Sequence, residues 1–189
     1  MIEGEIRGRL DDQELAKLTA LLEKEGELVA VQDREMILLR GYPGYSEDPN
    51  ARDVDIRLRN TNGSCEIMVK RKTSEHNVAR HEASLSLNCA DLESAKETVK
   101  ALGYESGLWM HRKKTVYSRN GIEWSLVEAP LGLTYYEAEQ EVAPGTDVEE
   151  VRLHLEKEAE SLGLSVLGPD AMREFIYELD EKVNKEISW

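Results

Sequence analysis

Charged residues of both signs recur at every second position along five short segments of this chain. The charges are Glu3, Glu5, Arg7 and Arg9; Asp55, Arg57 and Arg59; Glu66, Lys70 and Lys72; Arg80 and Glu82; and Glu137, Glu139 and Glu141. A period of two places side chains on the same face of a β-strand, about 7 Å apart. The pattern therefore predicts strands that each carry a charged face.

Such a charged face has two interpretations. In most antiparallel sheets it meets solvent, while the other face packs on helices. Exposed strands, however, usually mix Thr, Ser and Gln with their charges, whereas here charges of both signs are concentrated on five strands. This concentration favours an ion-filled interior over a solvent-facing sheet.

Helical periodicity appears between the strands. Apolar residues recur every three to four positions from Asp11 or Asp12 to Gly26, from Asp91 to Leu102, from Thr146 to Gly163 and from Pro169 to Val183. The pairs Asn62-Gly63 and Asn120-Gly121 predict tight hairpins, and residues 41–52, with two Pro and two Gly, predict a loop. We therefore expect an α+β fold with a single domain over residues 1–189.

The overall charge bears on the kind of partner. Lys and Arg total 24 against 38 Asp and Glu, which gives a net charge of −14 and argues against nucleic acid or anionic lipid as a partner. Any anion site must be a local basic island. No apolar signal segment opens the chain, and no run of about 18 apolar residues occurs. We expect a cytoplasmic protein that binds no membrane.

The charged faces also suggest a chemistry. Two carboxylates on one strand face can hold a divalent cation through hard oxygen ligands. Neighbouring Arg and Lys side chains can offset the charge on polyphosphate oxygens. At an effective dielectric of about 20, a cation about 4 Å from one phosphate charge gains roughly 4 kcal/mol before desolvation. A chain with net negative charge can therefore still bind a polyanion in such an interior.

The order of several motifs resembles that of a known superfamily. They are Glu3-Gly4-Glu5-Ile6-Arg7, Arg57 with Arg59, Lys70, Arg80-His81-Glu82, the basic strand from Arg112 to Tyr117, Glu137-Ala138-Glu139, Leu162-Gly163-Leu164 and Tyr177-Glu178-Leu179. Together they resemble CYTH, or triphosphate tunnel, proteins, which include class IV adenylyl cyclases, thiamine triphosphatases and inorganic and RNA triphosphatases. The resemblance covers nearly the whole chain. It implies an eight-stranded antiparallel β-barrel with helices packed outside and a tunnel that binds triphosphate with Mg or Mn.

The resemblance also implies roles at the matched positions. The implied catalytic residues are Glu3, Glu5 and Arg7. The implied substrate-binding residues are Arg7, Arg9, Arg57, Arg59, Lys70, Arg80, Arg112 and Lys114. The implied metal ligands are Glu3, Glu5, Glu82, Glu137 and Glu139.

These expectations point to a metal-dependent phosphohydrolase that acts on inorganic triphosphate, thiamine triphosphate or a nucleoside triphosphate. Two alternatives stay open: a class IV-type adenylyl cyclase and a catalytically silent polyphosphate- or nucleotide-binding module. The silent module is favoured by Arg7, which stands where the superfamily has Lys. Because Arg stays protonated, it can bind phosphate but not act as a general base. A homodimer is also left open.

Overall fold

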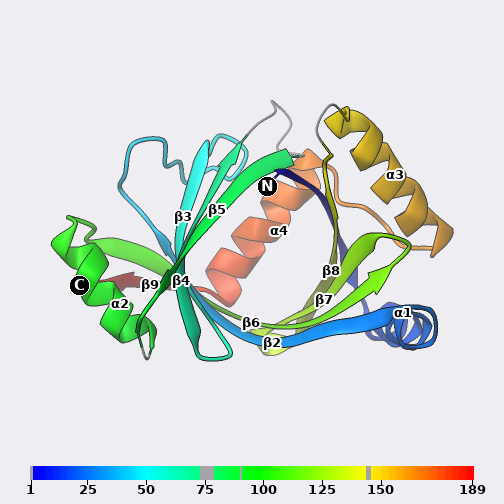
Figure 1. Ribbon diagram of the computed structural model, residues 1–189, viewed down its shortest axis with the longest axis horizontal. Helices are drawn as coiled ribbons and strands as arrows, with labels where there is room; N and C mark the ends of the chain where they lie inside the picture. The colour runs from blue at the N-terminus through cyan, green and yellow to red at the C-terminus, as the bar shows by residue number, and fades with distance from the viewer. Residues whose placement is uncertain (1, 73–78, 90, 144–145) are drawn as a thin grey trace.

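The computed structural model describes residues 2–72, 79–89, 91–143 and 146–189 (Figure 1). The strands are β1 (Ile2–Leu10), β2 (Glu27–Leu39), β3 (Val54–Thr61), β4 (Ser64–Lys72), β5 (Ala79–Leu87), β6 (Ser106–Arg119), β7 (Ile122–Ala129), β8 (Leu133–Glu141) and β9 (Lys185–Ser188). The helices are α1 (Asp12–Glu25), α2 (Leu92–Ala101), α3 (Val148–Ser161) and α4 (Pro169–Lys182). The four predicted helices are all confirmed.

Eight antiparallel strands close into a barrel. They follow the order β2-β3-β4-β5-β1-β8-β7-β6, and β6 closes the ring by pairing with β2 along most of its length. β9 is an additional strand, paired with β6 at residues 106–109. The α+β fold with an eight-stranded antiparallel barrel is therefore confirmed.

Two predicted hairpins set the register of neighbouring strands. In the β3–β4 turn, Asn62 and Gly63 have φ of 51° and 88°. In the β6–β7 turn, Asn120 and Gly121 have φ of 55° and 75°. Positive φ at both central positions is the geometry of a type I′ turn, whose twist matches that of the strands. These turns hold the charged positions of the paired strands on the same face.

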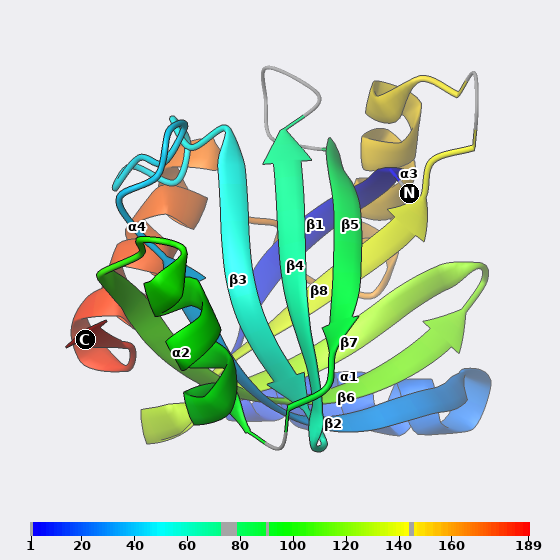
Figure 2. The ribbon, with the colours of Figure 1, turned by 60° about the vertical axis from the view of Figure 1, so that its left-hand side comes forward.

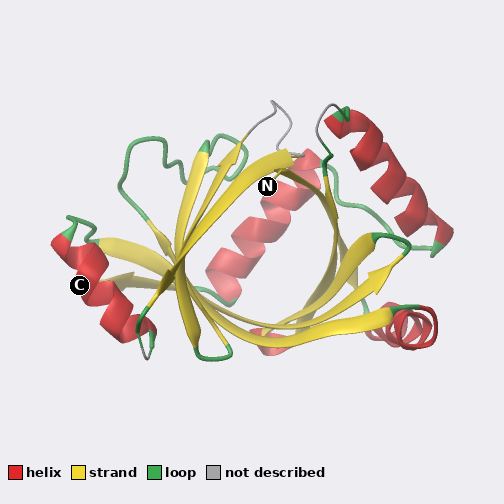
Figure 3. Ribbon diagram, viewed as in Figure 1, coloured by secondary structure: helices red, strands yellow, loops and turns green. Residues whose placement is uncertain are grey.

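Most of the hydrophobic core lies outside the barrel wall. Leu22 of α1 and Leu155 of α3 pack with Trp124 and Tyr136, and all four are fully buried. On another part of the wall, α2 packs against the outer face of β3 (Figure 2). Figure 3 shows these three helices around the ring of strands. Because the outward residues make the core, the inward residues are free to be polar.

Helix α4 has a different position from the other three. Its residues Phe175 and Leu179 pack against Val127 and Tyr135, which alternate with the outward-facing Leu126 and Tyr136 along their strands. In Figure 1, α4 is seen through the ring of strands. We infer that α4 covers one end of the barrel interior. None of the described helices has the length and apolar character needed to cross a membrane.

The connection between α3 and α4 passes directly over Gly8 of β1. The Leu167 N–H donates to the Arg7 carbonyl at 2.8 Å, and the Tyr136 hydroxyl donates to the Ser165 carbonyl at 3.0 Å. A Cβ on Gly8 would clash with the Ser165 carbonyl oxygen and the Tyr136 ring. Glycine is therefore required here for close approach of the chain that leads into α4.

We predict that Gly8→Ala destabilises the protein by about 2 kcal/mol or more, because the added methyl group meets backbone and a buried ring that cannot move away. Gly168→Ala is the control, since a Cβ there meets no atom of the described chain within 4 Å and the expected change is within about 0.5 kcal/mol. The measurement is the urea midpoint at equal m-values. Equal stability of the two variants would contradict the close packing of the connection on β1.

Candidate functional site in the barrel interior

The barrel encloses a cavity of about 360 Å³ whose wall is rich in charged side chains. Nine Lys and Arg residues and eight Asp and Glu residues line it. The lining is thus nearly balanced in charge, whereas the chain as a whole carries a charge of −14, so positive charge is concentrated in the cavity relative to the rest of the protein. The predicted site residues in the lining are Glu3, Glu5, Arg7, Arg57, Arg59, Lys70, Arg80, Glu82, Arg112, Lys114, Glu137 and Glu139.

Three carboxylates meet on the wall formed by β1 and β8. Glu5 lies directly opposite Glu139 in the strand register, and Glu137 lies opposite Arg7. One carboxylate oxygen from each of Glu5, Glu137 and Glu139 lies within 4.8 Å of the others. Side chains on adjacent paired strands are this close only when they share a face. Pairing of β1 with β8 therefore brings the Glu3–Arg7 and Glu137–Glu139 motifs, which are distant in the sequence, onto one inward face.

The three carboxylates have different electrostatic surroundings. Burial alone would raise the pKa of Glu137, but Lys114 and Arg7 hold it well below its ordinary value; the Lys114 Nζ–Oε2 distance is 2.6 Å and the Arg7 Nη2–Oε1 distance is 3.0 Å. Burial and the charges of Glu5 and Glu137 raise the pKa of Glu139 to about 8. Within the described ranges, Glu139 has no ion pair. The raised pKa therefore favours the protonated form of Glu139 in the metal-free cavity.

This donor set fits a divalent metal ion. Its oxygens are hard ligands of the kind that Mg²⁺ and Mn²⁺ prefer, and a cation among them would remove the repulsion that keeps Glu139 protonated. The other two predicted ligands, Glu3 and Glu82, lie elsewhere on the lining. Burial and the Glu82 carboxylate raise the pKa of Glu3, and Glu82 pairs with Lys70 at 3.1 Å. Among the described residues, only Glu5, Glu137 and Glu139 form a cluster that could hold a metal.

The predicted cations are held by specific partners. Arg7 forms an ion pair with Glu5, and its pKa is raised well above its ordinary value, because Glu5 and Glu137 outweigh the effect of burial. Arg59 donates to Glu66 at 2.7 Å, and Arg112 donates to Asn184 at 2.9 Å. These contacts orient long side chains before any ligand arrives.

Arg9 is the one predicted site residue outside the cavity lining. It forms an ion pair with Glu178 of α4, and its guanidinium carbon lies 4.6 Å from the centre of the Phe175 ring. Its position has a physical reason: α4 covers the end of the barrel where the inward face of β1 reaches Arg9. These contacts tie Arg9 to α4.

Several lining residues had no predicted role, and three of them, Arg34, Arg52 and Asp55, are charged residues on or next to β2 and β3. Arg34 of β2 donates to Thr61 at 3.2 Å and to Gln32 at 2.6 Å, and burial with the nearby charge of Arg59 lowers its pKa. Arg52 comes from the loop before β3, and Asp55 lies on the predicted charged face of β3. The alternation of Arg34, Met36 and Leu38 could have identified β2 as a strand. Asp55 could have been identified as a lining residue, since it lies two positions before Arg57 on the same strand face.

Comparisons with known proteins agree with this geometry. No family model and no curated protein matches the chain. Among solved structures, the PH1819 protein of Pyrococcus horikoshii OT3 matches with a TM-score of 0.73 and 22% identity, over 93% of this chain and 98% of that one. A candidate adenylate cyclase of Vibrio parahaemolyticus matches with a TM-score of 0.67 and 15% identity, over 87% and 90%.

A third similar structure is HpAC1 of Hippeastrum, a candidate adenylyl cyclase with a dominant triphosphatase activity. It matches with a TM-score of 0.55 and 17% identity, over 87% of this chain and 89% of that one. At these identities the likeness concerns the fold. The chain therefore shares the fold of these structures, an eight-stranded barrel of the kind that its resemblance to CYTH proteins implied.

Proposed function

We propose that the chain is a metal-dependent triphosphatase that binds its substrate inside the barrel. The observation that supports this most strongly is the joint position of the Glu5, Glu137 and Glu139 cluster and a set of arginine and lysine side chains in one cavity. A cluster of carboxylates alone would serve a metal, and a cluster of cations alone would serve an anion. Phosphoryl transfer needs both at the same place.

Each proposed role follows from the contacts of the residue. Glu5, Glu137 and Glu139 hold the metal, and we propose Mg or Mn, which carboxylate oxygens suit. A divalent cation bound there would neutralise charge on phosphoryl oxygens and polarise a water molecule. Glu3 lies on the lining outside this cluster, and its proposed role is that of an additional ligand or a hydrogen-bond partner for water.

The cations bind the polyphosphate chain. Arg57, Arg59, Lys70, Arg80, Arg112 and Lys114 line the cavity and would donate charge-assisted hydrogen bonds to phosphoryl oxygens. Arg7 contacts both Glu5 and Glu137, which places a fixed positive charge beside the proposed metal. Since the pKa of Arg7 is raised, it takes no proton from water, and its contribution to catalysis is electrostatic.

Hydrolysis suits this cavity better than cyclisation does. Hydrolysis asks for an ordered water and charge stabilisation along the triphosphate. Cyclisation also needs the ribose held with its 3′-oxygen about 3 Å from the α-phosphorus and in line with the leaving group. The triphosphatase activity of HpAC1, whose fold is similar, supports hydrolysis as the first function to test.

The reaction itself tests the proposal. With ATP and Mn²⁺, we predict ADP with phosphate, or AMP with pyrophosphate, rather than cyclic AMP, and we predict that Glu137→Gln with Glu139→Gln abolishes turnover. The control is Glu128→Gln with Glu141→Gln, which makes the same two chemical changes at exposed positions on β7 and β8. Chromatography separates the products. Cyclic AMP as the main product would favour a cyclase, and no turnover of any triphosphate compound would favour a silent binding module.

A second prediction concerns pH. Below pH 8 the carboxyl group of metal-free Glu139 carries a proton, because its pKa is raised to about 8, and a metal must displace that proton. We predict that the affinity for Mg²⁺ rises by about tenfold per pH unit from pH 6 to 8 and then levels off. Calorimetry in buffers of different ionisation enthalpy measures the proton released. Glu139→Gln should bind more weakly and without this pH slope; an unchanged slope would place the titrating group elsewhere.

A third prediction concerns the substrate. Arg57→Ala or Lys70→Ala should weaken binding of inorganic triphosphate by more than tenfold, because each variant loses a charge-assisted contact in a partly enclosed site. Lys24→Ala is the control for loss of one positive charge, since the Lys24 side chain is 81% exposed. Calorimetry without turnover measures the affinities. Equal affinities for all three variants would exclude Arg57 and Lys70 from the binding site.

A further inference from the structure

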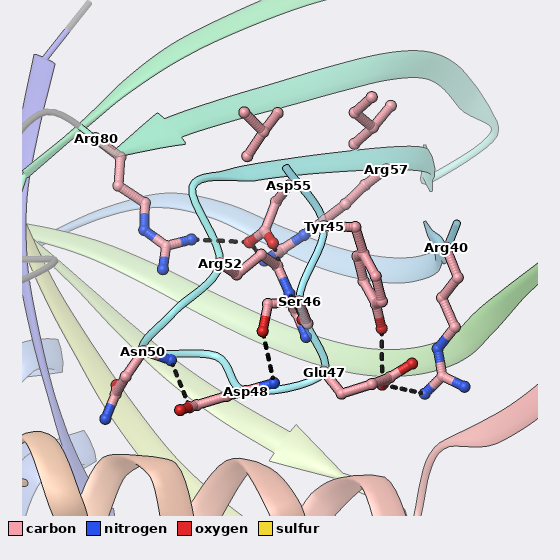
Figure 4. A network of polar contacts seen from close by, with 12 residues as sticks. Arg40, Tyr45, Ser46, Glu47, Asp48, Asn50, Arg52, Asp55, Arg57 and Arg80 are labelled. Carbon is pink, nitrogen blue, oxygen red and sulfur yellow. Dashed lines mark hydrogen bonds and ion pairs between the residues drawn. The ribbon is translucent and has the colours of Figure 1, made fainter. Parts of the chain in front are cut away.

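One carboxylate in the cavity lining is surrounded by three arginines. Asp55, on the inward face of β3, is 3% exposed. Its Oδ2 accepts hydrogen bonds from Arg57 Nη2 and Arg80 Nη1, each at 2.8 Å. Its Oδ1 accepts from Arg52 Nη1 at 3.3 Å. Figure 4 shows these side chains converging on the carboxylate.

The three arginines come from three different parts of the chain. Arg57 follows Asp55 on β3, Arg80 lies on β5, and Arg52 belongs to the loop between β2 and β3. The loop is fixed to this point, since Arg52 Nε donates to the Ser46 carbonyl at 2.7 Å and its guanidinium lies 4.9 Å from the Tyr45 ring centre. All three arginines line the cavity. Asp55 therefore links β3, β5 and the loop between β2 and β3.

The charges of this cluster do not cancel. Three guanidinium groups and one carboxylate leave a net charge of +2. Burial would raise the pKa of Asp55, but Arg57, Arg80 and Arg52 hold it far below its ordinary value. Asp55 is therefore ionised at neutral pH, and it accepts three hydrogen bonds from arginines. Glu139, in contrast, forms no ion pair among the described residues.

The arginines keep donors for a further anion. A guanidinium group has five N–H donors, and Asp55 accepts from one nitrogen of each arginine. The Arg57 Nε–H is buried and has no hydrogen-bond partner in the described structure. A buried donor without a partner is costly. A phosphoryl oxygen in the cavity would accept from arginine N–H groups that do not bond to the Asp55 carboxylate, such as the Arg57 Nε–H.

We propose that Asp55 is a positioning residue that holds Arg52, Arg57 and Arg80 together as one phosphate subsite of the tunnel. The proposal rests on the proposed function and names the residues that bind one end of the triphosphate. Asp55 itself contacts neither metal nor phosphate. It prevents three like charges from moving apart in the empty cavity, so that the incoming phosphate does not have to gather them.

The opposite effect is also physically conceivable, because a carboxylate can occupy the place of a phosphate. In that case Asp55→Asn would strengthen triphosphate binding by removing a competitor. The geometry favours positioning: Asp55 is buried on a paired strand, and it cannot leave when a ligand enters. Its two partners Arg57 and Arg80 share a single oxygen, which sets the distance between them.

The test is a double-mutant cycle with inorganic triphosphate in the absence of metal. Asp55→Asn should bind triphosphate about tenfold more weakly than the parent. In the Asp55→Asn background, Arg57→Ala should weaken triphosphate binding by less than about threefold, because Arg57 is no longer held in position by Asp55. Lys114 lies outside the cluster, so Lys114→Ala should weaken triphosphate binding by the same factor in the parent and in Asp55→Asn. A general loss of structure would not couple to Arg57 alone.

Two further variants complete the experiment. Asp53→Asn removes the same charge from an exposed position two residues away and should bind triphosphate like the parent. Arg52→Lys keeps the charge but loses the planar contacts with Asp55 and Tyr45, and should weaken binding about threefold; it serves if Asp55→Asn does not fold, as judged by thermal unfolding. Mg²⁺ affinity measured without triphosphate should stay within twofold in every variant of the cluster.

The outcomes separate the two proposals. If the parent binds triphosphate and Asp55→Asn binds equally or more tightly, the positioning role is overturned while the proposed function stands. If Arg57→Ala weakens triphosphate binding by the same factor in the parent and in Asp55→Asn, the positioning role is also overturned. If the parent binds neither inorganic triphosphate nor ATP, with or without Mn²⁺, both the proposed function and this subsite are wrong.

Discussion

Pairing of opposite charges inside the barrel is the interaction on which the rest of the structure depends. Glu137 is neutralised by Lys114 and Arg7, and Asp55 by three arginines. Removing one partner of a buried ion pair typically costs about 3–5 kcal/mol, because the other charge is left without compensation. The interior is therefore stable only as a network. Such a network adds little net stability compared with apolar packing, so its value lies in what it can bind.

The two faces of the barrel wall have different roles, and this difference allows the interior to be charged. Outward residues such as Trp124, Tyr136 and Leu58 are fully buried under α1, α2 and α3, and they provide the hydrophobic stabilisation of the fold. The inward residues at alternate positions need not contribute to it. Glu139 illustrates the consequence: its carboxylate is disfavoured in the metal-free cavity, a local cost that a bound cation would relieve.

Much of the fold could be predicted because its signals are local. A period of two gives the strand faces, Asn-Gly pairs give the hairpins, and capping residues with glycine ends give the helices. β2 was not predicted: Leu28, Val29 and Val31 are exposed near a bulge, so its amino-terminal half lacks clean alternation. Nor does the sequence reveal the pairing of β2 with β6, which closes the barrel.

The candidate site shows where alternation stops being informative. It correctly puts Arg7 and Arg9 on one face of β1, but only tertiary packing decides that Arg7 reaches the carboxylates while Arg9 meets α4. The same holds for Arg52, which a loop without periodicity carries into the cavity. Residues that share a face can be predicted from spacing, whereas residues that share a ligand depend on how strands and helices close around them.

The most direct measurement is a crystal structure of the protein with Mn²⁺ and inorganic triphosphate, with the metal located by its anomalous scattering. The proposed function predicts a manganese peak bonded to carboxylate oxygens of Glu5, Glu137 and Glu139, and a triphosphate in the cavity within hydrogen-bond distance of Arg57, Arg80 and Lys70. Manganese bound elsewhere, or triphosphate bound only on the outer surface, would contradict a tunnel that acts on triphosphate compounds.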